Sequence, residues 1–300
     1  MLDICLAGTG GMKPLPDRFL TGLWLEHDGY GLLIDCGEGM QVALAKHGCK
    51  TAKMDTLLIT HIHADHIAGL PGLLLTAGNG GRCGVLNIYG PKGTEKAVRS
   101  LMCITPELAF DVKITELTHH EITSFKWHDI TVSALPMRHK VPCLGYRFTE
   151  NRPPVFDPQR AMELGIPKMY WKLLHSGETV EHEGKTYSSK DISKEDRAPL
   201  ILTYMTDTVY FDRLSEYAAD SDLLICEGMY GSDEYIPKMK DKMHLVYSQA
   251  AYIAKKSASK RLWLTHYSPA NENPKKYDKT VKEYFPDITI SRDGERLTLK

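Results

Sequence analysis

Several features are missing from this 300-residue chain, and each absence excludes a class of protein. Its seven cysteines are odd in number and scattered, with no CxxC pair, which predicts reduced and mostly buried thiols rather than a disulfide framework. The first residues lack the basic and apolar segments of a secretory signal, and no apolar run is long enough to span a bilayer. We therefore expect a cytoplasmic protein with no membrane partner.

The chain also lacks an excess of charge of either sign, because 37 basic and 38 acidic residues leave a formal net charge of −1. No global property indicates nucleic-acid binding, so any RNA contact would have to come from a local basic patch. With 42% apolar residues, the chain can bury a sizeable core without a disulfide or a metal to hold it together. Its length suits one large α/β domain or two ordinary ones.

The most informative stretch covers residues 57–66, LLITHIHADH. Its apolar, partly β-branched beginning predicts a buried strand. The strand ends abruptly in three imidazoles and one carboxylate, which belong to His61, His63, Asp65 and His66. These groups gain nothing from a hydrophobic core, but they are the nitrogen and oxygen ligands that Zn²⁺ prefers. The alternative is a polar loop that happens to be rich in histidine, although such loops favour Asn, Ser and Gly.

The pattern of the chain predicts strands that alternate with helices, which favours an α/β layer architecture. The expected strands cover residues 2–7, 23–26, 31–35, 86–89, 111–117, 121–127, 130–134, 145–149, 200–204, 223–226 and 261–265, with a closing strand pair at 288–290 and 296–299. The expected helices cover about 36–47, 66–75, 243–256 and 278–285, and another follows Gly93.

Polar side chains follow apolar strands at eight positions along the chain. They are His61, His63, Asp65, His66, His139, Asp207, Glu227 and His266. In α/β folds the residues at one end of the strands converge on a shared crevice. Seven of the eight are suitable metal ligands, about the number that two neighbouring sites need when they share a bridging group and leave a position open for water.

This pattern resembles the metallo-β-lactamase superfamily, whose HxHxDH signature reads here His61-x-His63-x-Asp65-His66. It resembles more narrowly the ribonuclease Z family of tRNA 3′-end endonucleases. The matching segments are residues 33–41, 69–74 and 90–93, then His139 with 145–146, Asp207-Thr208, Glu227, His244 with 249–250, and 264–266. They follow the family's order over nearly the whole chain. The resemblance implies a four-layer αβ/βα sandwich.

The resemblance also implies two Zn²⁺ ions per subunit, one held by His61, His63 and His139. Asp65, His66 and His266 would hold the second, and Asp207 would bridge them; Mn²⁺ or Fe²⁺ accept the same ligands. A metal-bridging hydroxide would attack the scissile phosphorus, with Asp65 orienting or deprotonating it. His244, paired with Glu227, would protonate the departing 3′-oxygen. The implied partner is precursor tRNA, and the implied assembly is a homodimer.

Residues 151–198 differ in character, with many prolines and charges and little apolar material for a core of their own. We expect one domain over residues 1–300 with this segment as an inserted flexible arm, in the place where the family carries its tRNA-binding exosite. The family's Gly-Pro pair is replaced here by Lys168-Met169, and an arginine expected after His266 is missing. Basic residues of the arm could contact phosphates, namely Lys168, Lys172, Lys185, Lys190, Lys194 and Arg197. Acidic residues lie between them, so the arm could instead be merely solvated.

Two further residues have alternative roles. Asp35, at a strand end, could support a metal ligand or cap a turn. Arg18 could contact a phosphate or be a solvated loop cation.

Two other functions also remain open for the whole protein. One is a related metallohydrolase of small phosphodiesters or other esters, and the other is an RNA-binding protein that holds metal only structurally.

Overall fold

The computed structural model describes residues 1–105 and 107–300. The chain divides into two compact units, one formed by Met1–Phe148 with Ile201–Lys300 and the other by Thr149–Leu200. The first unit contains two seven-stranded sheets, and the second contains a short two-stranded sheet. None of the helices described in either unit is long and apolar enough to cross a membrane.

The first sheet has the strand order β16-β1-β2-β3-β4-β5-β6. Its strands are Leu2–Gly8 (β1), Gly22–His27 (β2), Tyr30–Ile34 (β3), Met54–Leu58 (β4), Leu86–Pro91 (β5), Val112–Leu117 (β6) and Glu295–Leu299 (β16). Strands β2 and β3 form an antiparallel hairpin, and Asp28 and Gly29 both have positive φ at its turn. From β3 to β6 the neighbouring strands run parallel.

The second sheet has the order β15-β14-β13-β12-β9-β8-β7. Its strands are Thr123–Trp127 (β7), Ile130–Pro136 (β8), Leu144–Glu150 (β9), Leu200–Met205 (β12), Leu223–Glu227 (β13), Leu262–Thr265 (β14) and Ile288–Ile290 (β15). Strands β12 to β15 run parallel. The prediction that the last two strands pair with each other is wrong, because β15 joins β14 whereas β16 crosses to the first sheet and pairs with β1.

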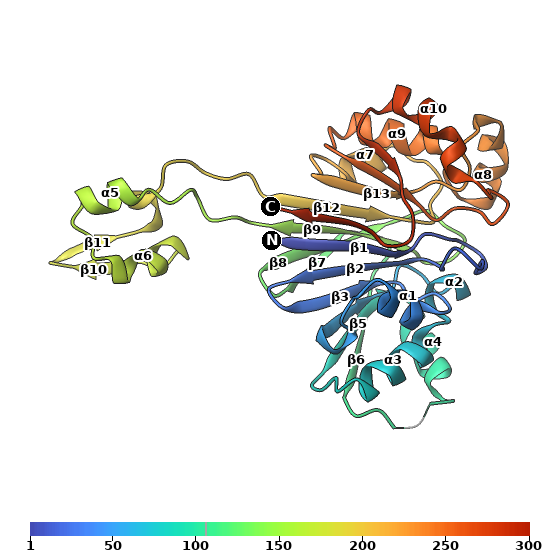
Figure 1. Ribbon diagram of the computed structural model, residues 1–300, viewed down its shortest axis with the longest axis horizontal. Coiled ribbons are helices and arrows are strands. Elements are labelled where there is room, and N and C mark those ends of the chain that lie inside the picture. Colours follow the sequence, from blue (N-terminus) through green and yellow to red (C-terminus); the bar gives the residue numbers. More distant parts are fainter. Residues whose placement is uncertain (106) are drawn as a thin grey trace. The chain divides into compact units, whose positions relative to one another are not determined.

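Helices cover the outer face of each sheet in the first unit, and the two sheets lie between them (Figure 1). The helices beside the first sheet are Met40–Lys46 (α1), Ala64–Ile67 (α2), Leu70–Asn79 (α3) and Thr94–Met102 (α4). Those beside the second are Arg213–Tyr217 (α7), Ile236–Lys242 (α8), Tyr247–Lys256 (α9) and Asp278–Tyr284 (α10). Separate apolar cores fill the two helix–sheet interfaces. The predicted αβ/βα sandwich is therefore confirmed.

The helix expected over residues 243–256 begins later than predicted. It starts at Tyr247, and α8, which was not predicted, ends at Lys242. Met243 has the left-handed backbone conformation (φ 63°, ψ 51°) that ends a helix, so the two helices cannot be continuous. His244 consequently lies in the loop between them rather than at a helix start.

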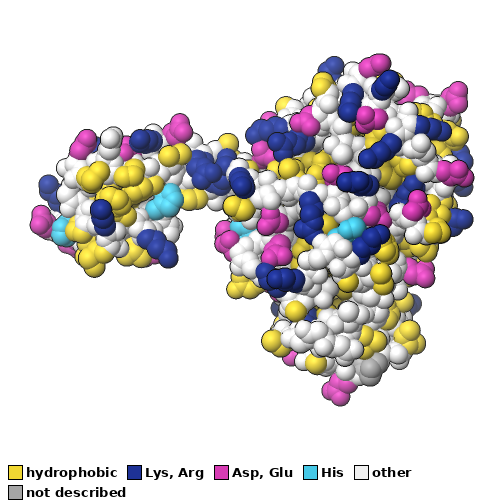
Figure 2. Space-filling model, viewed as in Figure 1, with side chains coloured by type: hydrophobic (Ala, Val, Ile, Leu, Met, Phe, Trp, Pro, Cys, Tyr) yellow, Lys and Arg dark blue, Asp and Glu magenta, His cyan; other side chains and the backbone are white. Residues whose placement is uncertain are grey.

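The second unit contains two helices, Pro158–Glu163 (α5) and Lys168–His175 (α6), and the hairpin Val180–His182 (β10) with Lys185–Tyr187 (β11). It has a small core of its own, which the composition did not predict; the buried side chains are Ala161, Ile166, Leu174, Val180 and Ile192. One or two apolar residues from each short element suffice, because they converge in space. Hydrophobic side chains also gather on the viewed face of this unit (Figure 2), and Met162 and Met169 are exposed.

Candidate metal centre

The predicted site residues lie at the carboxyl ends of strands from both sheets. His61 and His63 follow β4, His139 follows β8, Asp207 follows β12 and His266 follows β14. The ends of the two sheets are joined by hydrogen bonds, since Tyr146 of β9 donates its hydroxyl to the Ile59 carbonyl at 2.6 Å. Asp207 and His266 have positive φ (40° and 58°), an uncommon conformation for non-glycine residues that turns the chain sharply at the site.

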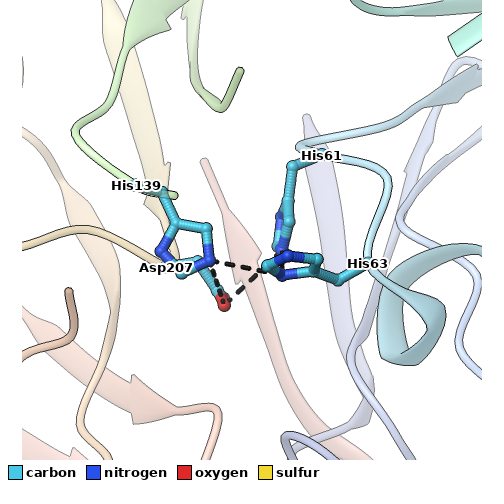
Figure 3. Close-up of side chains that lie close together, drawn as sticks. All are labelled: His61, His63, His139 and Asp207. Atoms are coloured by element: carbon cyan, nitrogen blue, oxygen red, sulfur yellow. Dashed lines mark hydrogen bonds and ion pairs between the residues drawn. The ribbon is translucent and has the colours of Figure 1, made fainter. Parts of the chain in front are cut away.

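One group of three histidines converges on Asp207, and Figure 3 shows their rings and the carboxylate pointing toward one another. His61 Nε2 lies 2.9 Å from His63 Nδ1, which lies 3.3 Å from His139 Nε2. Burial lowers the pKa of all three rings. They are therefore predominantly neutral at pH 7, the form in which imidazole binds a metal.

A second group consists of Asp65, His66 and His266. Nε2 of His66 lies 3.2 Å from Nε2 of His266, and Asp65 Oδ2 lies 3.6 Å from the latter. Burial raises the pKa of Asp65, but its contacts with the two histidines outweigh this and lower the pKa below the usual range. The carboxylate is accordingly ionised.

Asp207 faces both groups with different oxygens. Its Oδ2 lies 3.6 Å from His61 and 3.8 Å from His139, whereas its Oδ1 lies 3.4 Å from His66 and 3.1 Å from His266. The carboxylate is only 2% exposed. One oxygen toward each group is the arrangement that a carboxylate shared between two cations requires.

The donor atoms fit divalent cations. Within each group the candidate ligand atoms lie within 4.8 Å of one another. Nδ1–H of His139 donates to the Met243 carbonyl at 3.2 Å and Nδ1–H of His66 donates to Asp35 at 2.8 Å, so each ring directs its Nε2 lone pair inward. Burial alone would lower the pKa of His66, but Asp207 and Asp35 raise it well above the usual range. The Nε2 atoms of His66 and His266 are so close that either a proton or a metal cation must lie between their lone pairs.

Asp35 supports the second group, which was one of its two predicted roles. It is fully buried, and besides its bond to His66 its Oδ1 accepts the backbone N–H of Thr60 at 2.8 Å. The Thr60 hydroxyl donates to the same carboxylate and lies 3.1 Å from His61 Nδ1. Asp35 and Thr60 therefore set the orientation of one histidine in each group.

We expect Asp35→Asn to weaken metal binding by about 10- to 100-fold, because the amide cannot hold the same His66 tautomer with a charged acceptor. Titration of the metal-stripped protein with Zn²⁺ measures this directly. Asp3→Asn, an exposed change in β1, is the control. Unchanged affinity in Asp35→Asn would contradict the supporting role.

His244, which is partly exposed to the cavity, pairs with the buried Glu227 beside the ligands. Nδ1–H of His244 donates to Glu227 Oε2 at 2.9 Å, and the other carboxylate oxygen accepts the backbone N–H of Thr208 at 2.6 Å. Burial alone would lower the pKa of His244, but Glu227, with smaller effects from Asp207 and Asp65, raises it to about 9. A cation at the neighbouring ligands would oppose this rise. The pair can hold a proton next to the site.

Sequence reasoning missed contacts made by the backbone. The N–H of Met12 donates to Asp65 Oδ2 at 2.6 Å, and the Met243 carbonyl orients His139. No residue type signals such contacts.

Neither expectation for Arg18 is correct, since its side chain is buried and its guanidinium lies within 3.5 Å of the carbonyls of Ser268, Asn271 and Glu272. It ties two loops together.

A cavity of about 990 Å³ opens beside the ligands. The segment 12–17, the helix α8 and residues 268–270 contribute to its lining, together with His63, Asp65, His139, Asp207, His244 and His266. This volume is at the upper end of the range of about 300–1,000 Å³ for ligand pockets. His244 thus shares one substrate-accessible space with five of the candidate ligands, while Glu227 lies buried behind it.

Comparisons with known proteins agree with this geometry. Over 299 residues the chain is 42% identical to a ribonuclease Z from Agathobacter rectalis, covering 100% of this chain and 98% of the relative. It is 41% identical to a ribonuclease Z from Lachnoclostridium phytofermentans, with the same coverage. Human tRNase Z, short form, has a similar structure, with a TM-score of 0.71 at 24% identity over 99% of both chains.

Two further similarities concern the fold and the amino-terminal half. The metallo-β-lactamase-fold protein YhfI from Bacillus subtilis gives a TM-score of 0.70 at 20% identity and covers 99% of this chain and 98% of that one. Residues 2–152 match the family model described as Anti-Pycsar protein Apyc1. The relatives named ribonuclease Z match along the whole length, whereas this model ends four residues into the second unit.

The fold and the convergent His/Asp side chains define a protein of the metallo-β-lactamase fold with a candidate metal centre. Within that class, the chain belongs to the ribonuclease Z family. The resemblance seen in the sequence is therefore confirmed, and the protein is a metal-dependent endoribonuclease of that family.

Proposed function

We propose that the protein cleaves tRNA precursors endonucleolytically at the 3′ end, using two Zn²⁺ ions per subunit. The observation that carries the proposal is the position of Asp207, with one oxygen toward His61 and His139 and the other toward His66 and His266. His63 and Asp65 complete the two ligand groups. A structural metal site would not need this shared carboxylate beside a large cavity.

The bound cations would supply a nucleophile near neutral pH and stabilise negative charge on the phosphate. The chain's own residues do the rest. Asp65, held by the Met12 N–H, orients the attacking group and accepts its proton. His244, held by Glu227, gives a proton to the departing 3′-oxygen, which is a poor leaving group as an alkoxide.

Assembly, location and domain organisation are also proposals. A homodimer rests on the family resemblance, and sedimentation would measure it. A cytoplasmic location is supported by seven free cysteines. One metallo-β-lactamase-fold domain over residues 1–300, with residues 151–198 as an inserted arm, is supported by the split of the second unit from both sheets.

One assay tests the function. Purified protein with Zn²⁺ is incubated with a 3′-extended tRNA precursor and, separately, with bis-p-nitrophenyl phosphate. We expect cleavage of both. Cleavage of the small ester alone would make the protein a phosphodiesterase of small substrates, and cleavage of neither would leave a protein that holds metal structurally. Repeating the assay with Mn²⁺ and Fe²⁺ compares the metals.

A separate prediction concerns two basic residues of the arm. Lys168 and Lys172 are exposed, four residues apart on α6, and therefore on the same face. We expect the double change to Gln to raise KM for the tRNA precursor about tenfold, because phosphate contacts dominate affinity for RNA. The rise in KM for bis-p-nitrophenyl phosphate should be much smaller. Lys279→Gln, an exposed lysine of α10, is the control, and equal KM values in both variants would mean that the arm is merely solvated.

A further inference from the structure

The short helix α8 forms part of the cavity wall beside the proposed site. It lies between the strand that ends in Glu227 and the loop that carries His244. Met239 anchors it, being 2% exposed and packed in a small cluster with Met229 and Tyr230. Lys238 and Lys242 both line the cavity, and their spacing of four residues places them on one face of the helix.

These two lysines are not neutralised by the protein. Within residues 1–105 and 107–300, no ion pair is formed by either side chain. The Lys238 ammonium instead lies 5.3 Å from the ring centre of Tyr230 and 5.6 Å from that of Tyr235, two rings stacked 4.1 Å apart. Aromatic faces hold a cation in place without removing its charge.

The charge of the cavity differs from that of the whole chain. Lys13 and Lys140 also line it, which makes four lysines, whereas the only lining carboxylates outside the ligand groups, among the residues that the structure describes, are Asp17 and Glu272. The whole chain has a net charge of −1. A cation-rich wall on a near-neutral protein, beside a phosphodiester-cleaving centre, attracts a substrate with several phosphates.

We propose that Lys238 and Lys242 bind backbone phosphates of a single RNA strand next to the scissile bond, so that α8 grips the substrate within the cavity itself. Side chains at this spacing are about 5–6 Å apart at Cβ and can contact one phosphate or two neighbours. The inference rests on the proposed function for the identity of the polyanion as RNA. The contact is independent of the arm, because α8 belongs to the first unit.

The test uses the loaded enzyme and a matched pair of variants. Lys238→Gln with Lys242→Gln removes two of the four lysine charges that line the cavity. Lys240→Gln removes one charge from an exposed lysine of the same helix that does not line the cavity. KM is measured for a 3′-extended tRNA precursor. Ki is measured for a single-stranded oligoribonucleotide that competes with bis-p-nitrophenyl phosphate, over a range of salt concentrations.

For the double variant we expect KM and Ki to rise about tenfold, and the slope of log Ki against log salt to fall by about 0.7 for each lost phosphate contact. Lys240→Gln should change the slope by less than half of one such contact. If the double variant folds poorly, the same measurements are made on the Lys242→Gln single variant.

Three results would overturn the inference. The first is an unchanged slope in the double variant. The second is an equal effect of Lys240→Gln, which would reflect only general attraction. The third is a loss of activity toward bis-p-nitrophenyl phosphate as large as the loss toward RNA, which would place the lysines in the hydrolytic machinery. If the wild-type enzyme cleaves no tRNA precursor, the proposed function fails, and the Ki comparison still decides whether α8 binds RNA.

Discussion

Replacing Asp207 with alanine should lower cleavage of a tRNA precursor by about a thousandfold or more, because metal ions contribute several kcal/mol of transition-state stabilisation. The carboxylate is 2% exposed and faces both ligand groups. In the proposed two-metal centre, its loss would affect both sites at once and remove the negative charge that offsets the repulsion between the two cations. Metal content measured after dialysis should fall below that of the wild-type protein.

Asp212→Ala is the matched control for this change, because its carboxylate is 85% exposed and lies outside both groups. Activity toward bis-p-nitrophenyl phosphate should fall in parallel with tRNA cleavage in Asp207→Ala, since both reactions need the same centre. A variant that kept two tightly bound metals and most of its activity would show that Asp207 does not join the sites.

Replacing His244 with alanine should slow cleavage of the tRNA precursor by about 100- to 10,000-fold, the usual contribution of a general acid. The effect should depend on the leaving group. A ribose 3′-alkoxide needs a proton as it departs, whereas p-nitrophenolate is stable without one. Hydrolysis of bis-p-nitrophenyl phosphate should therefore lose far less, and comparing kcat for the two substrates measures the difference.

Glu227→Gln should reproduce part of this pattern, because the neutral amide still accepts a hydrogen bond from His244 but no longer raises its pKa as a carboxylate does. His120→Ala, an exposed histidine away from the cavity lining, is the control. Equal losses on both substrates in His244→Ala would instead indicate that the side chain positions His139 or a metal, not a proton.

Much of the site could be predicted because its residues directly follow apolar strands. A run such as 57–66 reveals its strand through periodicity and its ligands through residue type, and both signals are local. The loop between α8 and α9 was harder to predict from the sequence. Its position depends on the left-handed conformation of Met243, a non-glycine residue with no local signature of a helix end.

The closing strands show the same limit. Residues 288–290 and 295–299 are both short and partly apolar, so the sequence reveals that they are strands but not which partners they choose. One pairs with β14 and the other with β1 of the opposite sheet. The core of the second unit was missed for a related reason, because five buried side chains from separate short elements meet only after folding.

The sequence by itself determined that a metal site lies at a strand end, since the types and spacing of His61, His63, Asp65 and His66 suit metal ligands and not a core. Only the tertiary structure decided how the cluster is divided and what surrounds it. The direction of each Asp207 oxygen, the carbonyl of Met243 behind His139 and the lysines of α8 at the cavity all depend on segments far apart in the chain. Residue type and local pattern cannot encode such distances, because they arise from packing between two sheets.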